Sequence, residues 1–293
     1  MMDAAASKQF HPNFARPPVY IIFEADHTLY KLDITPFRDS SEVFHSLYLD
    51  ATSHGQGVPN PYVLNGITEK QMSAFCGYIQ RLSWDPPVSR DDLLDILPVA
   101  CTLKVHPIVD HCLSCLNLDS ASFAFRLFVS IQSRDKDLMV DSIRAMIQNP
   151  LSASPSADIS RLPLHVYITI TRARETLSRQ KQEVARFEPD IARAAGCSSR
   201  KHRQCDKTWK KIWSESICVP LLQPDSPIKL ADGPMMLRKG IRQVPVTDIS
   251  KECLRHVRRD IISHPKWLTV WGRGDIIECE AIEKITVALD LHP

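Results

Sequence analysis

Residues 19–32, VYIIFEADHTLYKL, decide how the fold begins. Two runs rich in β-branched and aromatic residues, Val19–Phe23 and Thr28–Leu32, are typical of strands. The interval Glu24–His27 between them has the length of a hairpin loop. We therefore expect the two strands to pair antiparallel and to start a small sheet.

Helix signals follow the hairpin. Ser40 or Ser41 offers an N-cap for a helix whose apolar face contains Phe44. After a loop rich in Ser, Gly, Asn and Pro, Tyr62–Leu64 is predicted to form a brief third strand.

Two further caps predict the helices after that strand. Thr68 and Gln71 have the spacing of a capping box, and Ser89 with Asp92 repeats the arrangement. Pro98 falls inside the second of these helices and is expected to kink or split it. The predicted order is strand, strand, helix, strand and three helices.

Residues around the first helix carry a family likeness. Asp33, Phe37, Ser41 and Phe44 fall where the family frame has His, an apolar residue, Ser and Phe, so three positions match and Asp33 departs. PYVLNGIT at residues 61–68 looks like a short strand of the fungal members. With the order of elements, these residues resemble the BTB/POZ domain in its fungal, basidiomycete-type branch.

The resemblance covers about Val19–Leu118. It implies an α+β fold, in which a BTB/POZ-like domain with a short three-stranded sheet precedes a mainly α-helical C-terminal region. It also implies a protein-interaction module that self-associates as a homodimer or serves as an adaptor or scaffold, with a cullin-type ubiquitin ligase as one option. The interaction residues that it implies are Ile34, Phe37, Ser41 and Phe44.

The remaining chain is predicted to be helical. Leu151–Ile159 is the best linker candidate, a long helix is expected from Pro163 to about Phe187, and Val219–Pro234 is predicted to be a Pro-rich loop. Pro265 is expected to end a helix. The predicted ranges are a flexible N-terminus at 1–18, the BTB/POZ-like domain at 19–118, a helical extension at 119–196 and a mixed, mostly helical region at 197–293.

Composition narrows the function classes. Hydrophobic residues at 44% and charged residues at 24% are typical of a globular protein, and a formal charge of +2 is too small for general attraction to nucleic acid or membrane. Nine scattered cysteines, the lack of a secretion signal and the lack of an apolar run of membrane-spanning length indicate the cytoplasm or nucleus. No catalytic motif is present, so we expect neither an enzyme nor a cofactor.

Two sets of residues have a composition that zinc favours. The first lies mainly on one helix, where free cysteines are expected to pack as small hydrophobes; its members are Cys101, His106, His111, Cys112 and Cys115. The second, Cys197, His202 and Cys205, is expected in an exposed polar loop. It lacks a fourth ligand nearby, so we expect no structural metal unless one arrives from His256, Cys218 or Cys253.

The basic segment 200–211 supplies an alternative function. Its Lys and Arg residues, interleaved with Trp209 and followed by Trp213, suit a nucleic-acid-associated transcriptional regulator. The preferred interpretation is a solvated helix face whose tryptophans pack inward, because the net charge supplies no wider attraction.

Overall fold

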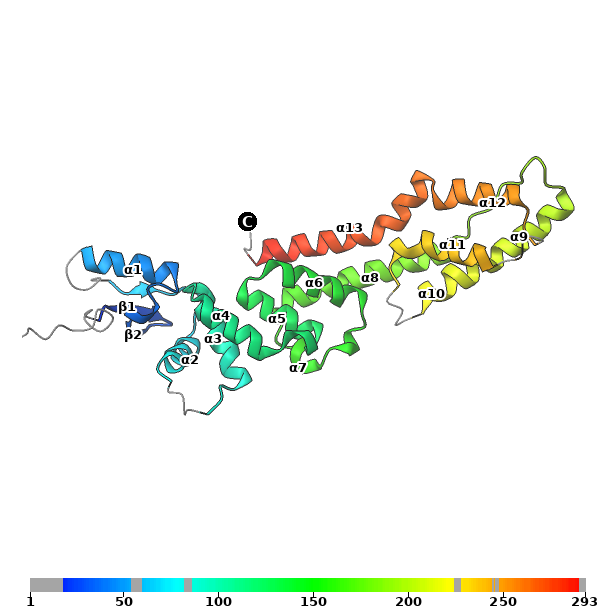
Figure 1. The fold of residues 1–293 in the computed structure, drawn as a ribbon. Coiled ribbons are helices and arrows are strands. Elements are labelled where there is room, and N and C mark those ends of the chain that lie inside the picture. The colour runs from blue at the N-terminus through cyan, green and yellow to red at the C-terminus, as the bar shows by residue number, and fades with distance from the viewer. Residues whose placement is uncertain are drawn as a thin grey trace, which may run out of the picture. The chain divides into compact units, whose positions relative to one another are not determined.

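The computed structural model describes residues 18–53, 60–81, 86–223, 228–243, 245 and 248–289, and Figure 1 shows its ribbon. Its elements are many helices and one small sheet, so the predicted α+β class is confirmed. The chain divides into two compact units, the first formed by Met1–Ser120 with Gln132–Arg134 and the second by Ala121–Ile131 with Asp135–Pro293.

The sheet of the first unit has three strands in the order β2-β1-β3. β1 (Tyr20–Ala25) and β2 (Thr28–Asp33) pair antiparallel as predicted, and β3 (Tyr62–Val63) runs parallel to β1. Asp26 and His27 between β1 and β2 have φ angles of 50° and 65°. Both angles are left-handed, which a two-residue hairpin turn requires.

The helices of the first unit begin at the predicted caps. Ser41 Oγ accepts a hydrogen bond from Phe44 N at 3.1 Å, and Thr68 with Gln71 forms a complete capping box. Pro98 lies inside α3, which continues past it rather than splitting. These helices are α1 (Glu42–Ser53), α2 (Glu69–Ile79), α3 (Arg90–Thr102) and α4 (His106–Leu116).

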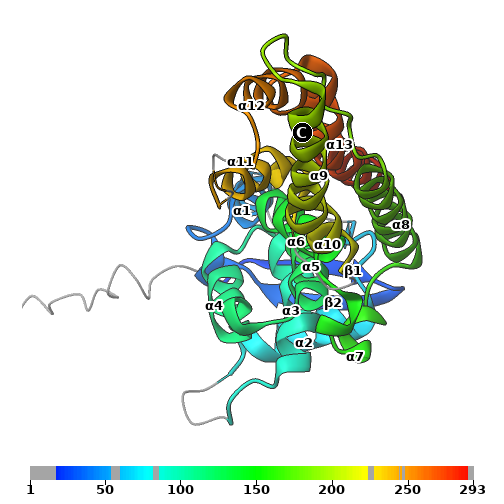
Figure 2. The same cartoon turned by 90° about the vertical axis from the view of Figure 1, so that its right-hand side faces the viewer.

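The second unit is helical in the described ranges, and the predicted long helix is confirmed as α8. The last helix, α13, packs along α8 (Figures 1 and 2). No helix in the described part of the chain combines the length and the apolar character needed to cross a bilayer. The helices are α5 (Phe123–Ser133), α6 (Lys136–Gln148), α7 (Ser156–Ile159), α8 (Leu164–Arg186), α9 (Ser199–Trp213), α10 (Val219–Leu222), α11 (Gly233–Gln243), α12 (Lys251–Val257) and α13 (Pro265–Ala288).

Two predictions about the second unit were wrong. The expected linker contains a 3₁₀ turn at Leu151–Ala153 and helix α7. The expected loop at Val219–Pro234 contains α10 and the start of α11. The helical stretch that begins at Lys251 ends at Ile262, shortly before Pro265, as predicted. Pro265 is also the first residue of α13, because proline fits the first turn, where its missing N–H has no helical partner to lose.

Four tryptophans pack together in the core of the second unit. Trp213 has ring-centroid distances of 5.8 Å to Trp209, 5.7 Å to Trp267 and 6.2 Å to Trp271. Gly233, at the start of α11, lies directly against the ring of Trp271 and leaves no room for a Cβ atom. Aromatic packing therefore joins α9, α11 and α13.

Candidate functional sites

Three of the four residues that the family likeness assigned to interaction are buried in the first unit. Ile34 and Phe44 have no exposed surface. Ser41 Oγ donates to Leu103 O in addition to capping α1, so it fastens α1 to the end of α3. These three side chains stabilise the unit and offer no surface to a partner, because packing and hydrogen bonding already cover them. Phe37 alone of the four is half-buried.

Phe37 lies at an open pocket of about 610 Å³ in the first unit. Its ring packs on Phe44 with the centroids 5.9 Å apart. The rest of the lining comes from the end of α2, the start of α3 and α4, and includes Tyr78, Arg81, Leu93, Ile108 and His111. The pocket therefore joins a partly exposed aromatic ring to both apolar and cationic neighbours.

The sheet carries a second apolar surface that the sequence reasoning missed. Tyr20 is 46% exposed, Ile22 38%, Leu29 60% and Val63 54%, whereas the alternate residues of β1 are buried. We call these four residues the outer sheet face. A strand that is apolar on both faces appears in the sequence as an uninterrupted apolar run. Residues 19–23 form such a run, so the sequence did contain a signal for an apolar outer face.

Charged side chains alternate with the apolar residues of the outer sheet face. Lys31 pairs with Ile22 in the strand register, and Glu24 pairs with Leu29. The ammonium group of Lys31 lies 4.6 Å from the centroid of the Tyr20 ring. Asp33 pairs with Tyr20 in the same register, so the face offers apolar area together with one cation, Lys31, and two anions, Glu24 and Asp33.

The helical Cys/His set does not form a compact metal centre in the structure. Cys115 Sγ lies 3.6 Å from His111 Nε2, but Cys112 is fully buried. Burial raises the pKa of the Cys112 thiol to about 12 and that of Cys101 to about 11. Both thiols are therefore protonated at neutral pH and act as small apolar side chains, as predicted for Cys112, whereas Cys115, for which the same packing was predicted, is exposed.

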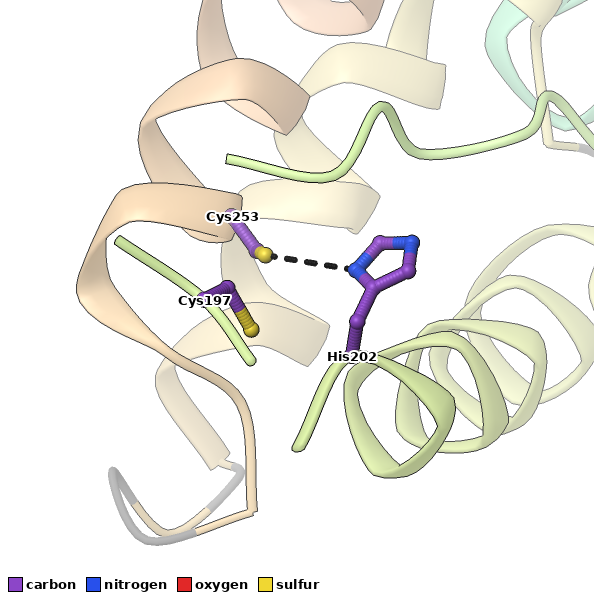
Figure 3. Close-up of side chains that lie close together, drawn as sticks. All are labelled: Cys197, His202 and Cys253. Carbon is purple, nitrogen blue, oxygen red and sulfur yellow. Dashed lines mark hydrogen bonds between the residues drawn. The ribbon is translucent and has the colours of Figure 1, made fainter. Parts of the chain in front are cut away.

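The location and the burial of the second Cys/His set differ from those predicted. His202 and Cys205 lie on α9 rather than in a loop, and Cys197 and Cys205 are buried. Cys253 from α12 joins them, with Sγ 3.6 Å from His202 Nδ1 (Figure 3). Among the described residues, the ligand atoms of Cys197, His202 and Cys253 are the group of three that lie within 4.8 Å of one another.

Hydrogen bonds around Cys253 change its acidity. Burial alone would raise the pKa of this thiol, but hydrogen bonds with Ser250, the backbone of Ala194, His202 and Cys197 outweigh burial and lower the pKa to about 7. Burial raises the pKa of Cys197. Of these two thiols, Cys253 carries the larger thiolate fraction at neutral pH.

The basic segment forms the exposed side of α9. Trp209 and Trp213 are buried, whereas the Lys and Arg residues of α9 are exposed, so the preferred interpretation of this helix is confirmed. Lys210 forms an ion pair with Asp206, with Nζ and Oδ2 3.0 Å apart. Because both tryptophans are buried, nucleic-acid bases have no exposed ring on which to stack. Only contacts between the exposed Lys and Arg side chains and phosphates then support the alternative of a nucleic-acid-associated transcriptional regulator.

Comparison of this chain with protein-family models, with curated proteins and with solved structures finds no match.

Proposed function

We propose that this chain is a protein-interaction module whose first unit self-associates through the outer sheet face. The observation that carries the proposal is the exposure of Tyr20, Ile22, Leu29 and Val63 on one side of the sheet, from 38% to 60% each. Soluble monomers rarely leave a contiguous apolar patch open, and such patches mark contact surfaces.

A second copy of the chain suits this face because the charges on it complement one another across a two-fold axis. In a two-fold contact, the same patch of each copy meets its counterpart. Lys31 of one copy can then face Glu24 of the other, while the apolar residues between them pack together. Lys31 is exposed, whereas Glu24 is half-buried and lies between Leu29 and Val63 in the strand register, so Lys31 of the second copy would pair with an anion that lies among the apolar residues.

The outer sheet face is too small to support a tight dimer alone. A stable interface buries roughly 1,200 Å² or more in total. We therefore expect a dimer that forms and dissociates over a measurable concentration range.

The proposal includes the adaptor role that the BTB/POZ likeness implies, and it assigns no catalytic step to the chain. In this role the first unit pairs with a second copy, and the second unit holds another protein. A link to a cullin-type ubiquitin ligase is tested separately, by whether a purified cullin scaffold elutes with the full chain in size-exclusion chromatography.

Light scattering on the full chain across a wide concentration range tests self-association. The measured mass should rise towards that of a dimer, and Leu29→Arg should hold it at that of a monomer, because this side chain is 60% exposed on the outer sheet face. Leu164→Arg is the matched control, since Leu164 is 71% exposed on α8 in the second unit.

The light-scattering results either support or overturn self-association through the outer sheet face. A dimer that Leu29→Arg dissociates and Leu164→Arg leaves intact supports the proposal. A monomer at every concentration, or a dimer that Leu164→Arg disrupts equally, would overturn self-association through this face. Phe37→Arg in the same assay shows whether the pocket contributes area to the contact.

A further inference from the structure

Four side chains of the types that bind zinc, three Cys and one His, lie near one another in the second unit. Cys197 lies in the turn before α9, His202 and Cys205 lie on α9, and Cys253 lies at the start of α12. We infer that Cys197, His202 and Cys253 bind a structural zinc ion and that Cys205 is its fourth ligand. This inference is independent of the proposed function.

Two distances between candidate ligand atoms are close to those of a tetrahedral zinc site. Zn–S bonds of about 2.3 Å and Zn–N bonds of about 2.0–2.1 Å place ligand S and N atoms about 3.6 Å apart and two S atoms about 3.8 Å apart. Cys253 Sγ and His202 Nδ1 are 3.6 Å apart, and Cys197 Sγ and Cys205 Sγ are 4.0 Å apart. The ligand atoms of Cys197, His202 and Cys253 lie within 4.8 Å of one another, whereas that of Cys205 lies outside this group, so its side chain must move closer to bind the same ion.

Two contacts place Cys205 beside the cluster of Cys197, His202 and Cys253. Its Sγ lies beside that of Cys197 and accepts a hydrogen bond from Ser250 N at 3.3 Å. Ser250 also accepts a bond from Cys253 N through its hydroxyl at 3.2 Å, so it orients both cysteines. His202 and Cys205 are three residues apart on α9 and share one face of that helix.

The origin of the ligands distinguishes this set from the one on α4. Structural zinc sites gather ligands from separate segments, often a turn and a helix. His202 and Cys253 meet although they are 51 residues apart in the sequence, and Cys197 comes from a turn (Figure 3). We expected no structural metal from the sequence because a fourth ligand was missing nearby, and the fold brings Cys253, one of the three distant candidates, to Cys197 and His202.

Neither apolar packing nor a disulfide explains the whole arrangement. Buried cysteines can pack as small hydrophobes, but an imidazole nitrogen within 3.6 Å of a thiol is a polar contact. A disulfide between Cys197 and Cys205 would use two thiols and leave His202 and Cys253 without a role. A soft cation satisfies all four side chains at once.

Zinc would join the start of α9 to the start of α12. Each coordinating thiol releases its proton to solvent when the metal binds, so affinity should rise with pH. Three thiolates and one Zn²⁺ leave a single net negative charge. Arg200, Lys201 and Arg203, which are exposed beside the ligands on α9, offset this charge.

Elemental analysis of the purified full chain tests the site. After preparation in reductant with added zinc and removal of the excess, we expect about one zinc per chain, and most of it should be lost in Cys197→Ser and Cys253→Ser. Cys112→Ser is the matched control, because Cys112 is equally buried but lies outside the cluster. Cys205→Ser should weaken zinc binding by about 10-fold or more if Cys205 is the fourth ligand.

Alkylation of the unmodified chain keeps the test valid if a variant fails to fold. Zinc should protect Cys197, Cys205 and Cys253, and a chelator should make them reactive. Cys115 and Cys279 are exposed and should react in both states. A chain that retains no zinc, an equal loss of zinc in Cys112→Ser and Cys253→Ser, or a Cys197–Cys205 disulfide in the reduced preparation would overturn the inference.

Discussion

The two units differ in how far apart in the sequence their decisive residues lie. In the first unit, a hairpin turn and helix caps join residues that are a few positions apart. In the second, the tryptophan core and the Cys/His cluster bring together segments separated by 50 residues or more, such as His202 and Cys253. The elements of the first unit are therefore predictable from local patterns, even though Ser41 and Leu103 meet across 62 positions, whereas the core and the cluster of the second unit are evident only in the folded chain.

The largest expected effect tests the core of the first unit. Phe44→Ala removes a fully buried ring that packs on Phe23 with a centroid distance of 6.0 Å. It should cost about 3–5 kcal/mol through lost burial and a residual cavity, enough to unfold a marginally stable unit. Calorimetry of the full chain checks this, with Phe187→Ala as the control because Phe187 is 73% exposed. An unchanged first-unit transition in Phe44→Ala would contradict the account.

The second prediction tests the tryptophan core of the second unit. A methyl group on Gly233 would overlap the ring of Trp271, so Gly233→Ala should destabilise this unit by about 1–3 kcal/mol. Gly272→Ala makes the same change on α13 where nothing lies near the new Cβ, and it should stabilise the helix by about 0.5–1 kcal/mol. Chemical denaturation measures both, and effects of equal sign would show that the aromatic packing is wrongly described.

A third prediction tests the Ser41 cap of α1, which the sequence predicted. Ser41→Ala removes the cap of α1 and the bond to Leu103 O, and should cost about 0.5–2 kcal/mol. Ser46→Ala, on the exposed side of the same helix, should be neutral or slightly stabilising. The melting temperatures of the two variants compare them directly. If both melted alike, the Ser41 hydroxyl would have no capping role.

The smallest expected effect concerns a surface ion pair of the first unit. Lys104 Nζ donates to Glu42 Oε2 at 2.7 Å, and this hydrogen bond lowers the pKa of Glu42. A lowered folded-state pKa stabilises above the unfolded pKa, and this contribution is lost as pH falls through the folded value. The stability difference between the unmodified chain and Lys104→Gln should thus shrink on acidification. A difference that grew in acid would contradict the pairing.

The sequence predicted the features that depend on near neighbours. The strands of residues 19–33, the capping box at Thr68 and the long helix from Pro163 follow from periodicity and capping rules. The helix end before Pro265 was also predicted, but not the start of α13 at Pro265, because proline can both stop a helix and begin one, and the residues after it decide whether a new helix forms. Those residues include Trp267 and Trp271, whose packing partner Trp213 lies far away in the sequence.

The candidate sites were predicted less completely than the elements. Cys197, His202 and Cys205 were identified by composition, but their burial and the arrival of Cys253 depend on how α12 packs near α9. On the outer sheet face, the apolar run at 19–23 was visible, but not which residues would remain uncovered. Burial is set by contacts between distant segments, so a residue's role in a core or on a surface cannot be read from its neighbours alone.

The central claim is that a zinc cross-link between distant segments stabilises the second unit but not the first. Hydrogen exchange of the full chain, with and without a zinc chelator, tests this claim most directly. The account predicts that chelation speeds amide exchange at the start of α9 and in α12, because the zinc cross-link between them is lost, while β1, β2 and α1 exchange unchanged. Exchange that is unaffected throughout, or that rises equally in both units, would contradict it.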